Sequence, residues 1–335
     1  MVTTVMSIDE AWRNVLAAAE KQGLQALQDA QVREVLAFIK HETVTSTRKA
    51  PLAEIKSGTS GSRSVIGKYF TVNNFRRIVR AYLDIALSDE PLLTYAGQKL
   101  SYAQYCFGSQ GTADDVRTKG VALFGDTRFM NEEFKRVTAI ECLRAGLKVF
   151  YVADDEFLAI PTPVGSLWLK ENSFSFSFNH TPSHNKADND GIKFNPYDGG
   201  PAGDFIVDVV NARIAEYLEN DSFENDAFAC GCQAEGVDYI YSVFTAEAAA
   251  AKDKQLFFDI TPQTILSWYA QRLVQKVDLT AVVEKVRAGE LAIVHTPFYG
   301  SGNGYVREVY KRTPDILDNG VWVQNESRNI LFDGK

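Results

Sequence analysis

A strand, a helix and a second strand follow one another in residues 120–153, and this unit constrains the fold more than any other part of the chain. Val121–Phe124 is a short apolar strand, apolar residues at helical spacing run from Phe134 to Leu143, and Val149–Val152 is the next strand. Two strands joined by a helix in this way lie parallel and need a right-handed crossover. The segment therefore predicts an α/β fold with a mixed, mainly parallel sheet and flanking helices.

The whole chain has 335 residues, which is enough for two domains. Residues 1–53 form a helical N-terminal extension, because apolar side chains recur at helical spacing over 8–40 and Gly23 interrupts the run. Residues 54–255 form the first α/β domain. Residues 256–335 begin a second, partial α/β domain with a strand near 321–323.

Within the first domain, the same reasoning places further elements around the strand–helix–strand unit. Alternating apolar residues predict a strand over 173–178. Helical spacing predicts helices over 73–87 and 204–218. Residues 88–119 show little periodicity and predict an insertion or a long loop, and residues 179–203 predict a long loop.

Charge and cysteine content exclude several classes of protein. The net charge of −8 and pI of about 5.2 argue against a nucleic-acid or anionic-membrane surface. No apolar run approaches the roughly 20 residues that span a bilayer, and the first 30 residues lack the pattern of a signal peptide. The four cysteines fit free thiols. The Cys230-Gly-Cys232 pair could alternatively be redox-active or supply half of the ligands of a metal site. We therefore expect a cytoplasmic protein without a nucleic-acid or membrane partner.

The segment His180–Asn185 carries the residues best suited to chemistry. It follows a predicted strand, at the position where open α/β sheets bind ligands. Ser183 is a candidate nucleophile, His184 a proton-transfer partner, and Lys193 a point charge suited to phosphate. The residues alone also fit an ordinary turn. A zinc pair of His180 and His184 is disfavoured, because Pro182 prevents them from sharing a helix face.

Several motifs, in order along the chain, resemble those of α-D-phosphohexomutases, most like the N-terminal half of a bacterial phosphoglucomutase. The run TPSHN at Thr181–Asn185, followed by DGIKFNP and GGPA, is similar to the phosphoserine loop of that family. Gly58–Arg63 resembles the opening GTSGxR, Gly125–Arg128 resembles the GKDTH or GGDGR turn, and Pro161–Pro163 resembles TPTP. Thr296–Gly302 resembles a segment of domain two.

This resemblance implies a function for each matching residue. Ser183 would carry a phosphoryl group, His184 would move the hydroxyl proton, and Lys193 would help to neutralise the phosphate. Contacts to phosphate or substrate are implied for Arg63, Ser60, Asn185 and Arg128. The resemblance further implies Mg²⁺ held by the phosphate of Ser183, glucose 1,6-bisphosphate as activator, and a substrate that is a hexose phosphate of glucose or mannose.

The sequence also departs from the family pattern. Lys186 stands where the family has Pro, and Ser64 stands where it has Gly. We find no DGDADR-type metal loop and expect little or no mutase turnover from this chain, whose function would then need a homo-oligomer or a complementary C-terminal half. Two alternatives stay open. The chain could bind a sugar phosphate or a partner without catalysis, or the Ser183 loop could be a remnant in a structural or regulatory domain.

Overall fold

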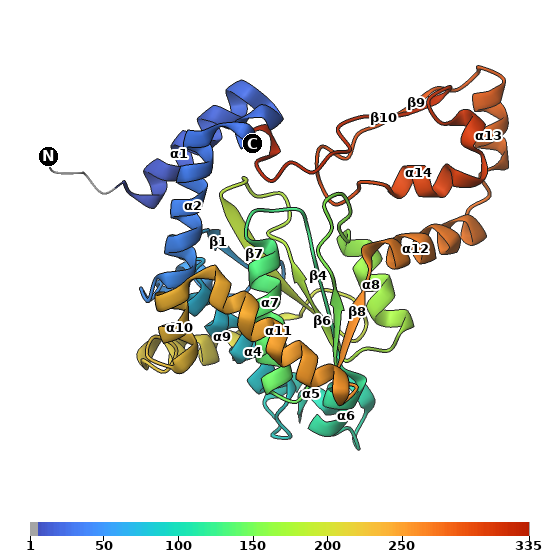
Figure 1. Cartoon of the computed structure of the whole chain (residues 1–335). Coiled ribbons are helices and arrows are strands. Elements are labelled where there is room, and N and C mark those ends of the chain that lie inside the picture. The colour runs from blue at the N-terminus through green and yellow to red at the C-terminus, as the bar shows by residue number, and fades with distance from the viewer. Residues whose placement is uncertain (1–5, 335) are drawn as a thin grey trace, which may run out of the picture.

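The computed structural model describes residues 6–334 and has a six-stranded sheet at its centre, with helices on both faces (Figure 1). The strand order is β1-β7-β6-β4-β5-β8. Strands β4, β5, β6 and β8 are parallel, whereas β7 runs antiparallel to both of its neighbours. The strands are β1 (Ser62–Val65), β4 (Val121–Gly125), β5 (Val149–Val152), β6 (Phe176–His180), β7 (Asn189–Pro196) and β8 (Phe257–Ile260). The predicted mixed, mainly parallel α/β fold is confirmed.

Two layers of helices cover this sheet. One face carries the long helices α4 (Val72–Ala86), α7 (Asn131–Arg144), α9 (Asp204–Glu219) and α11 (Val237–Asp253), and the other face carries α8 (Thr162–Glu171) and α12 (Pro262–Lys276). The side chains of β4 alternate between the two layers: Val121 and Leu123 lie in the larger core, and Ala122 and Phe124 lie in the smaller one. A strand buried on both faces is apolar throughout, which is why β4 was readable from the sequence.

The N-terminal extension consists of two helices that pack on the first face. They are α1 (Ile8–Gln22) and α2 (Ala30–Thr45), joined by a 3₁₀ turn, η1 (Gly23–Gln28). Gly23 ends α1 with a φ of 57°, as its predicted breaking role requires. Trp12 is buried and its Nε1 donates to the carbonyl of Ile66, 2.9 Å away. The extension is therefore part of the body of the protein within the described residues.

Two segments that were expected to be loops contain regular structure. Residues 88–119 hold a small hairpin, β2 (Leu93–Tyr95) and β3 (Gln98–Leu100), and two short helices, α5 (Tyr102–Phe107) and α6 (Ala113–Lys119). Reciprocal side-chain caps begin both helices, which makes them stable despite their length. Residues 179–203 hold β7, whose polar sequence hides a strand that is paired on both sides.

The segment after residue 255 contributes to two different sheets. Strand β8 pairs with β5 in the main sheet, so this part of the predicted second domain joins the first. The later strands β9 (Ile293–His295) and β10 (Val321–Val323) form a separate parallel pair. Its small core includes Val283, Val286, Ile316 and Val321, with helices α13 (Thr280–Arg287) and α14 (Tyr305–Val309) beside it. We call residues 277–323 the small unit.

The chain then returns from the small unit to the N-terminal helices. Leu331 is fully buried in the larger core, and the 3₁₀ turn η4 (Phe332–Gly334) lies against α1 (Figure 1). Gly334 approaches the backbone of Leu16 so closely that a Cβ atom there would lie 2.5 Å from its carbonyl oxygen. The returning segment thus closes over the side of the sheet at which β4 and β6 end.

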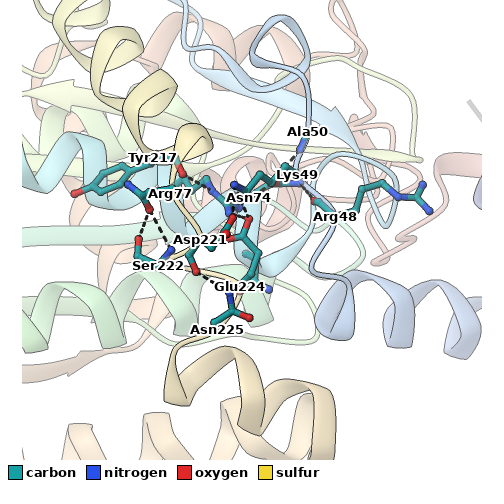
Figure 2. Close-up of polar contacts among 12 residues, drawn as sticks. Arg48, Lys49, Ala50, Asn74, Arg77, Tyr217, Asp221, Ser222, Glu224 and Asn225 are labelled. Atoms are coloured by element: carbon teal, nitrogen blue, oxygen red, sulfur yellow. Dashed lines mark hydrogen bonds and ion pairs between the residues drawn. The ribbon is translucent and has the colours of Figure 1, made fainter.

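A buried cluster around Arg77 of α4 ties the linker after α2 to the loop before α10 (Ala227–Glu235). Arg77 is fully buried and donates to Glu224, to Asn74 Oδ1 at 3.1 Å and to the carbonyl of Tyr217 at 3.2 Å (Figure 2). Asn74 in turn donates to the carbonyl of Arg48 at 2.9 Å. These contacts satisfy a buried guanidinium, which would otherwise be costly.

Within residues 6–334, no helix combines the length and the apolar character that crossing a membrane requires.

Candidate active site

Ser183 lies at the tip of the loop that joins β6 to β7, at the carboxyl edge of the parallel strands. Its side chain is exposed, and its backbone has a φ of 68°, in the left-handed region. The Ser183 Oγ lies 3.3 Å from Nδ1 of His184, and the Ser183 amide donates to Oγ1 of Thr181 at 3.1 Å. A left-handed serine is uncommon and has to be held by its surroundings. The loop therefore presents the hydroxyl outward beside a group that can accept its proton.

Arg128 provides that support from the turn after β4. Its guanidinium is buried and donates to four carbonyl oxygens of the serine loop, at 2.6 Å to Asn185, 2.7 Å to Lys186 and 3.3 Å to Ser183 and Asn189. Its Nε also contacts a carboxylate oxygen of Asp126 at 3.3 Å, and the ring of Phe332 covers it with a centroid distance of 4.9 Å. Arg128 thus positions the loop backbone, whereas the resemblance implied a phosphate contact for it.

Two carboxyl groups, one partly buried and one fully buried, lie beneath the loop. Asp126 accepts from the amide of Arg128 at 3.0 Å and from Asn131 Nδ2 at 3.3 Å. Asp190 is fully buried; one of its oxygens accepts from the amide of Gly191 at 2.7 Å, and the other has no hydrogen-bond partner within the described residues. Burial, and next the nearby Asp126, raise the pKa of Asp190 well above its usual range. Both effects disfavour the charged form of the Asp190 carboxyl group.

Asn131 is the first residue of helix α7, and its side chain joins the ends of two strands. It donates to the carbonyl of His180 at 2.7 Å, and the N-cap position belongs to Met130, which has a φ of 66°. Gly125 makes room for this contact, because a Cβ atom there would lie 2.2 Å from Oδ1 of Asn131. The ends of β4 and β6 are therefore joined through one amide side chain, which local capping rules do not reveal.

Two cationic side chains lie near the serine. Arg63, on the exposed edge of β1, donates to Asn185 Oδ1 at 3.2 Å and to the carbonyl of Pro182 at 3.4 Å. Lys193, on β7, is half-buried; desolvation, and next the positive charge of Arg63, lower its pKa. Within the described residues, neither of these side chains forms an ion pair, and two positive charges on the strands next to the serine loop favour an anionic ligand.

The remaining predicted site residues lie as follows. Ser60 is exposed in the turn Gly58–Gly61, which packs against β7 so closely that a Cβ atom on Gly61 would lie 2.3 Å from the carbonyl oxygen of Ile192. Asn185 accepts hydrogen bonds from two arginines: its side-chain oxygen from Arg63 and its backbone carbonyl from Arg128. The structure therefore gathers Ser183, His184, Asn185, Arg63 and Arg128 around one loop, with Lys193 and Ser60 on the adjoining strand and turn.

His180 is separate from this group. It is fully buried, with Nε2 2.8 Å from Thr138 Oγ1 and Nδ1 3.1 Å from the carbonyl of Phe124. Burial lowers the pKa of His180 to about 3, so the ring is neutral. It serves the packing between β6 and α7, whereas His184 is exposed.

Neither the cysteines nor the acidic residues form a metal site in the described part of the chain. Cys230 and Cys232 are free thiols on helix α10, one exposed and one buried, and burial raises the pKa of Cys232 to about 12. No three histidine, cysteine, aspartate or glutamate side chains converge within residues 6–334. The residues around Ser183 therefore do not make up a Mg²⁺ site by themselves.

Comparisons with known proteins identify the fold that holds this loop. Residues 103–221 match the family model for the α/β/α domain I of phosphoglucomutase and phosphomannomutase. A Thermus thermophilus protein described as a phosphomannomutase superposes with a TM-score of 0.55 at 20% identity, covering 86% of this chain and 48% of that chain. Residues 103–221 are thus similar to domain I of this family, and the fold of the chain is that of a solved phosphohexomutase structure.

Another solved phosphohexomutase structure gives the same result. The Paramecium exocytosis-sensitive phosphoprotein pp63/parafusin, a phosphoglucomutase in its open form, superposes with a TM-score of 0.54 at 14% identity, covering 87% of this chain and 46% of that chain. The chain spans about half the length of the solved structures that it matches. No curated protein matches the sequence.

Proposed function

We propose that Ser183 is the phosphoryl-accepting residue of a phosphoglucomutase-like phosphotransferase that interconverts hexose 1-phosphate and 6-phosphate. The observation that carries this proposal is the exposed Ser183 hydroxyl, 3.3 Å from His184 Nδ1, on a loop whose backbone Arg128 holds at four carbonyl oxygens. Phosphoryl transfer depends mainly on positioning and charge neutralisation, and a fixed loop supplies the first of these.

The proposed step balances with the groups at this loop. The Ser183 Oγ attacks the phosphorus of a hexose bisphosphate and a new P–O bond forms. The bond from phosphorus to the sugar oxygen breaks, and the hydroxyl proton passes through His184 to that departing oxygen. The products are phosphoserine and a hexose monophosphate. Transfer of the phosphoryl group from Ser183 to the free hydroxyl of a hexose 1-phosphate would form a bisphosphate. Removal of its other phosphate by Ser183 would then complete the isomerisation.

Arg63 and Lys193 supply the proposed charge neutralisation. The first is exposed beside Asn185, and the second is half-buried with a lowered pKa. A phosphate between them would favour the charged form of Lys193, because a nearby anion stabilises an ammonium group. Mg²⁺ and glucose 1,6-bisphosphate remain proposed cofactors, and no step above is routed through the metal, since the surrounding residues do not complete a site for it.

The direct test is phosphorylation of the purified chain by glucose 1,6-bisphosphate, with and without Mg²⁺, read by peptide mass spectrometry. We expect phosphate on Ser183 and none in Ser183→Ala. Ser173→Ala is the matched control, because Ser173 is also an exposed serine with a left-handed backbone (φ 55°) but precedes β6 on the opposite edge of the sheet. Phosphate on other residues, or equal labelling of Ser183→Ala, would refute the proposal.

A second function, binding of a sugar phosphate without turnover, is favoured by one observation. No three histidine, cysteine, aspartate or glutamate side chains that could hold a metal ion converge within residues 6–334. A coupled assay of glucose 1-phosphate to glucose 6-phosphate separates the two. We expect little or no turnover from this chain alone, together with Ser183 labelling. Saturable binding of glucose 1-phosphate with neither labelling nor turnover would support the binding function instead.

A further inference from the structure

A cavity of about 560 Å³ lies between helices at the edge of the sheet opposite to the serine loop. Helix α6 ends directly before β4 begins, and α7 ends shortly before β5 begins, so both helix ends lie at the amino edge of the parallel strands. Ser183 follows β6 and lies at the carboxyl edge. Figure 1 shows α6 at the end of the sheet away from the η4 turn. The cavity is thus separate from the proposed phosphoserine site.

Four arginines from four different helices line this cavity. They are Arg80 of α4, Arg117 of α6, Arg144 of α7 and Arg213 of α9. Asp84 is the only acidic residue of the lining, although the chain as a whole carries a net charge of −8. Each arginine side chain is about one-third exposed, between 33% and 39%. A concentration of positive charge in a concave surface of an acidic protein favours an anionic ligand.

Asp84, in the lining, lies 3.5 Å from Arg213 and 3.8 Å from Arg80, whereas the closest carboxylate partners of three of the arginines lie outside the lining. The N···O distances are 2.6 Å from Arg213 to Glu216, 2.8 Å from Arg117 to Asp114 and 2.9 Å from Arg144 to Glu247. A guanidinium has five N–H donors in a planar fork, and one carboxylate occupies at most two of them. Donors therefore remain for a ligand in the cavity.

Helix capping explains only part of this arrangement. Arg117 donates through Nε to the carbonyl of Ala145, just after the end of α7, at 3.3 Å, and Arg144 lies in the last turn of that helix. Neither reason applies to Arg80, which lies 3.8 Å from both Asp84 and Glu141 and makes no hydrogen bond within residues 6–334. Arg80 therefore lines the cavity with two carboxylates nearby but with none of its N–H donors used in a hydrogen bond within the described residues.

We propose that this cavity binds a small metabolite that carries at least two phosphate groups. Arginine forks match phosphate oxygens in pairs, and four forks around one cavity can satisfy two phosphates. Leu83 and Leu87 provide an apolar wall for the body of such a molecule, and Ser88 adds a hydroxyl. The volume lies within the range of about 300–1,000 Å³ that is typical of small-molecule sites. This proposal does not depend on the activity of Ser183.

The experiment is isothermal titration of the full chain with inorganic pyrophosphate at low and high salt. We expect saturable binding that weakens with salt, and a loss of affinity of about tenfold or more for Arg117→Gln and for Arg144→Gln, because each removes a charged hydrogen-bond donor from the cavity. The matched control is Arg272→Gln, whose arginine is similarly exposed (43%) and pairs with Glu171 elsewhere. It should bind pyrophosphate as the unaltered chain does.

A second measurement keeps the proposal testable if a cavity variant fails to fold. Phenylglyoxal modifies accessible arginines, and pyrophosphate should protect Arg117, Arg144 and Arg213 in the unaltered chain but not Arg272. Absence of both binding and protection would overturn the proposal. So would binding that Arg63→Gln abolishes while Arg117→Gln and Arg144→Gln retain it, because the pyrophosphate would then occupy the serine loop.

Discussion

The main sheet and the small unit at residues 277–323 are both α/β structures with parallel strands, yet they differ in how much of each strand is covered. All five residues of β4 and of β6 are buried. In the small unit, Val294 of β9 is 62% exposed and Phe298, in the turn after it, is 70% exposed. The main sheet has a helical layer on both faces, whereas the two-stranded β9–β10 pair rests on one small core.

The serine loop therefore lies on the main sheet, the region whose strands are covered by helices on both faces. Its neighbours below are buried carboxyl, amide and guanidinium groups, and these depend on the completely covered strands β4 and β6. Burial of apolar surface supplies most of the stability of such a sheet, so the main sheet should dominate the free energy of unfolding. The following predictions test that expectation, from the largest effect to the smallest.

Replacing Phe178 with alanine should destabilise the main sheet by about 3–5 kcal/mol, the usual cost of removing a buried phenyl group. Phe178 is fully buried on β6 and packs edge-on against Tyr82 and Phe194. Urea unfolding followed by circular dichroism measures the loss. Phe298→Ala in the small unit is the control and should change stability by less than about 0.5 kcal/mol. Equal effects of the two variants would break the comparison.

Arg77→Met should cost about 3 kcal/mol, because it leaves the buried Glu224 without its main partner. We place it at the lower end of the range for such a change, since Lys49 remains 3.7 Å from that carboxylate. The double variant Arg77→Met/Glu224→Gln should recover part of the loss in the same urea experiment. In the small unit, Arg287→Met breaks an exposed pair with Asp315 and should cost no more than about 1 kcal/mol.

Acid should destabilise the main sheet through His180. Its pKa is about 3 in the folded protein, below the ordinary 6.5, so the unfolded chain binds the proton more tightly. The stability that the neutral ring provides is complete above pH 6.5 and is lost as the pH falls toward 3, by about 2 kcal/mol between pH 7 and pH 5. Asp190 acts in the opposite direction, because its raised pKa stabilises the fold toward low pH.

The contribution of His180 is therefore measured as the difference in pH dependence between the unaltered chain and His180→Gln. His180→Gln should show a flatter dependence of unfolding free energy on pH between 7 and 5 than the unaltered chain. His41→Gln, at an exposed histidine of α2, should leave that dependence unchanged. Identical pH profiles for all three chains would show that the His180 ring is not the group that titrates.

The smallest effect is expected in the small unit. Ile316→Val removes one methylene from a buried side chain and should cost about 1 kcal/mol. The fluorescence of Trp322, on β10, should report this change, whereas Phe178→Ala should alter mainly the circular dichroism transition. A single transition shifted equally by both variants would mean that the two regions unfold together.

The sequence predicted the covered strands well, because burial on both faces leaves an apolar run that is visible without the fold. It failed for β7, since Asn189, Asp190 and Gly191 are typical of turns and only pairing with β1 and β6 makes them a strand. Helices α5 and α6 were missed although Ser101 with Gln104 and Thr112 with Asp115 are capping patterns.

In the candidate site, too, the residues of a local motif could be predicted from the sequence, whereas roles that depend on distant contacts could not. Ser183, His184 and Lys193 follow from a local motif. The positioning role of Arg128 does not, because the carbonyls that it holds lie 55 to 61 residues further along the chain. The raised pKa of Asp190 likewise depends on burial that only the assembled sheet creates. Tertiary contacts of this kind leave no periodic trace in the sequence.

The left-handed backbone at Ser183 restricts which amino acids an engineer can place there. Threonine also has a hydroxyl group, but its branched Cβ is strained at a φ of 68°. Aspartate and asparagine tolerate this conformation better than most residues. Ser183→Asp should therefore be the least disruptive way to hold a permanent negative charge at the loop tip, whereas a Ser-to-Thr exchange would distort the loop before any chemistry takes place.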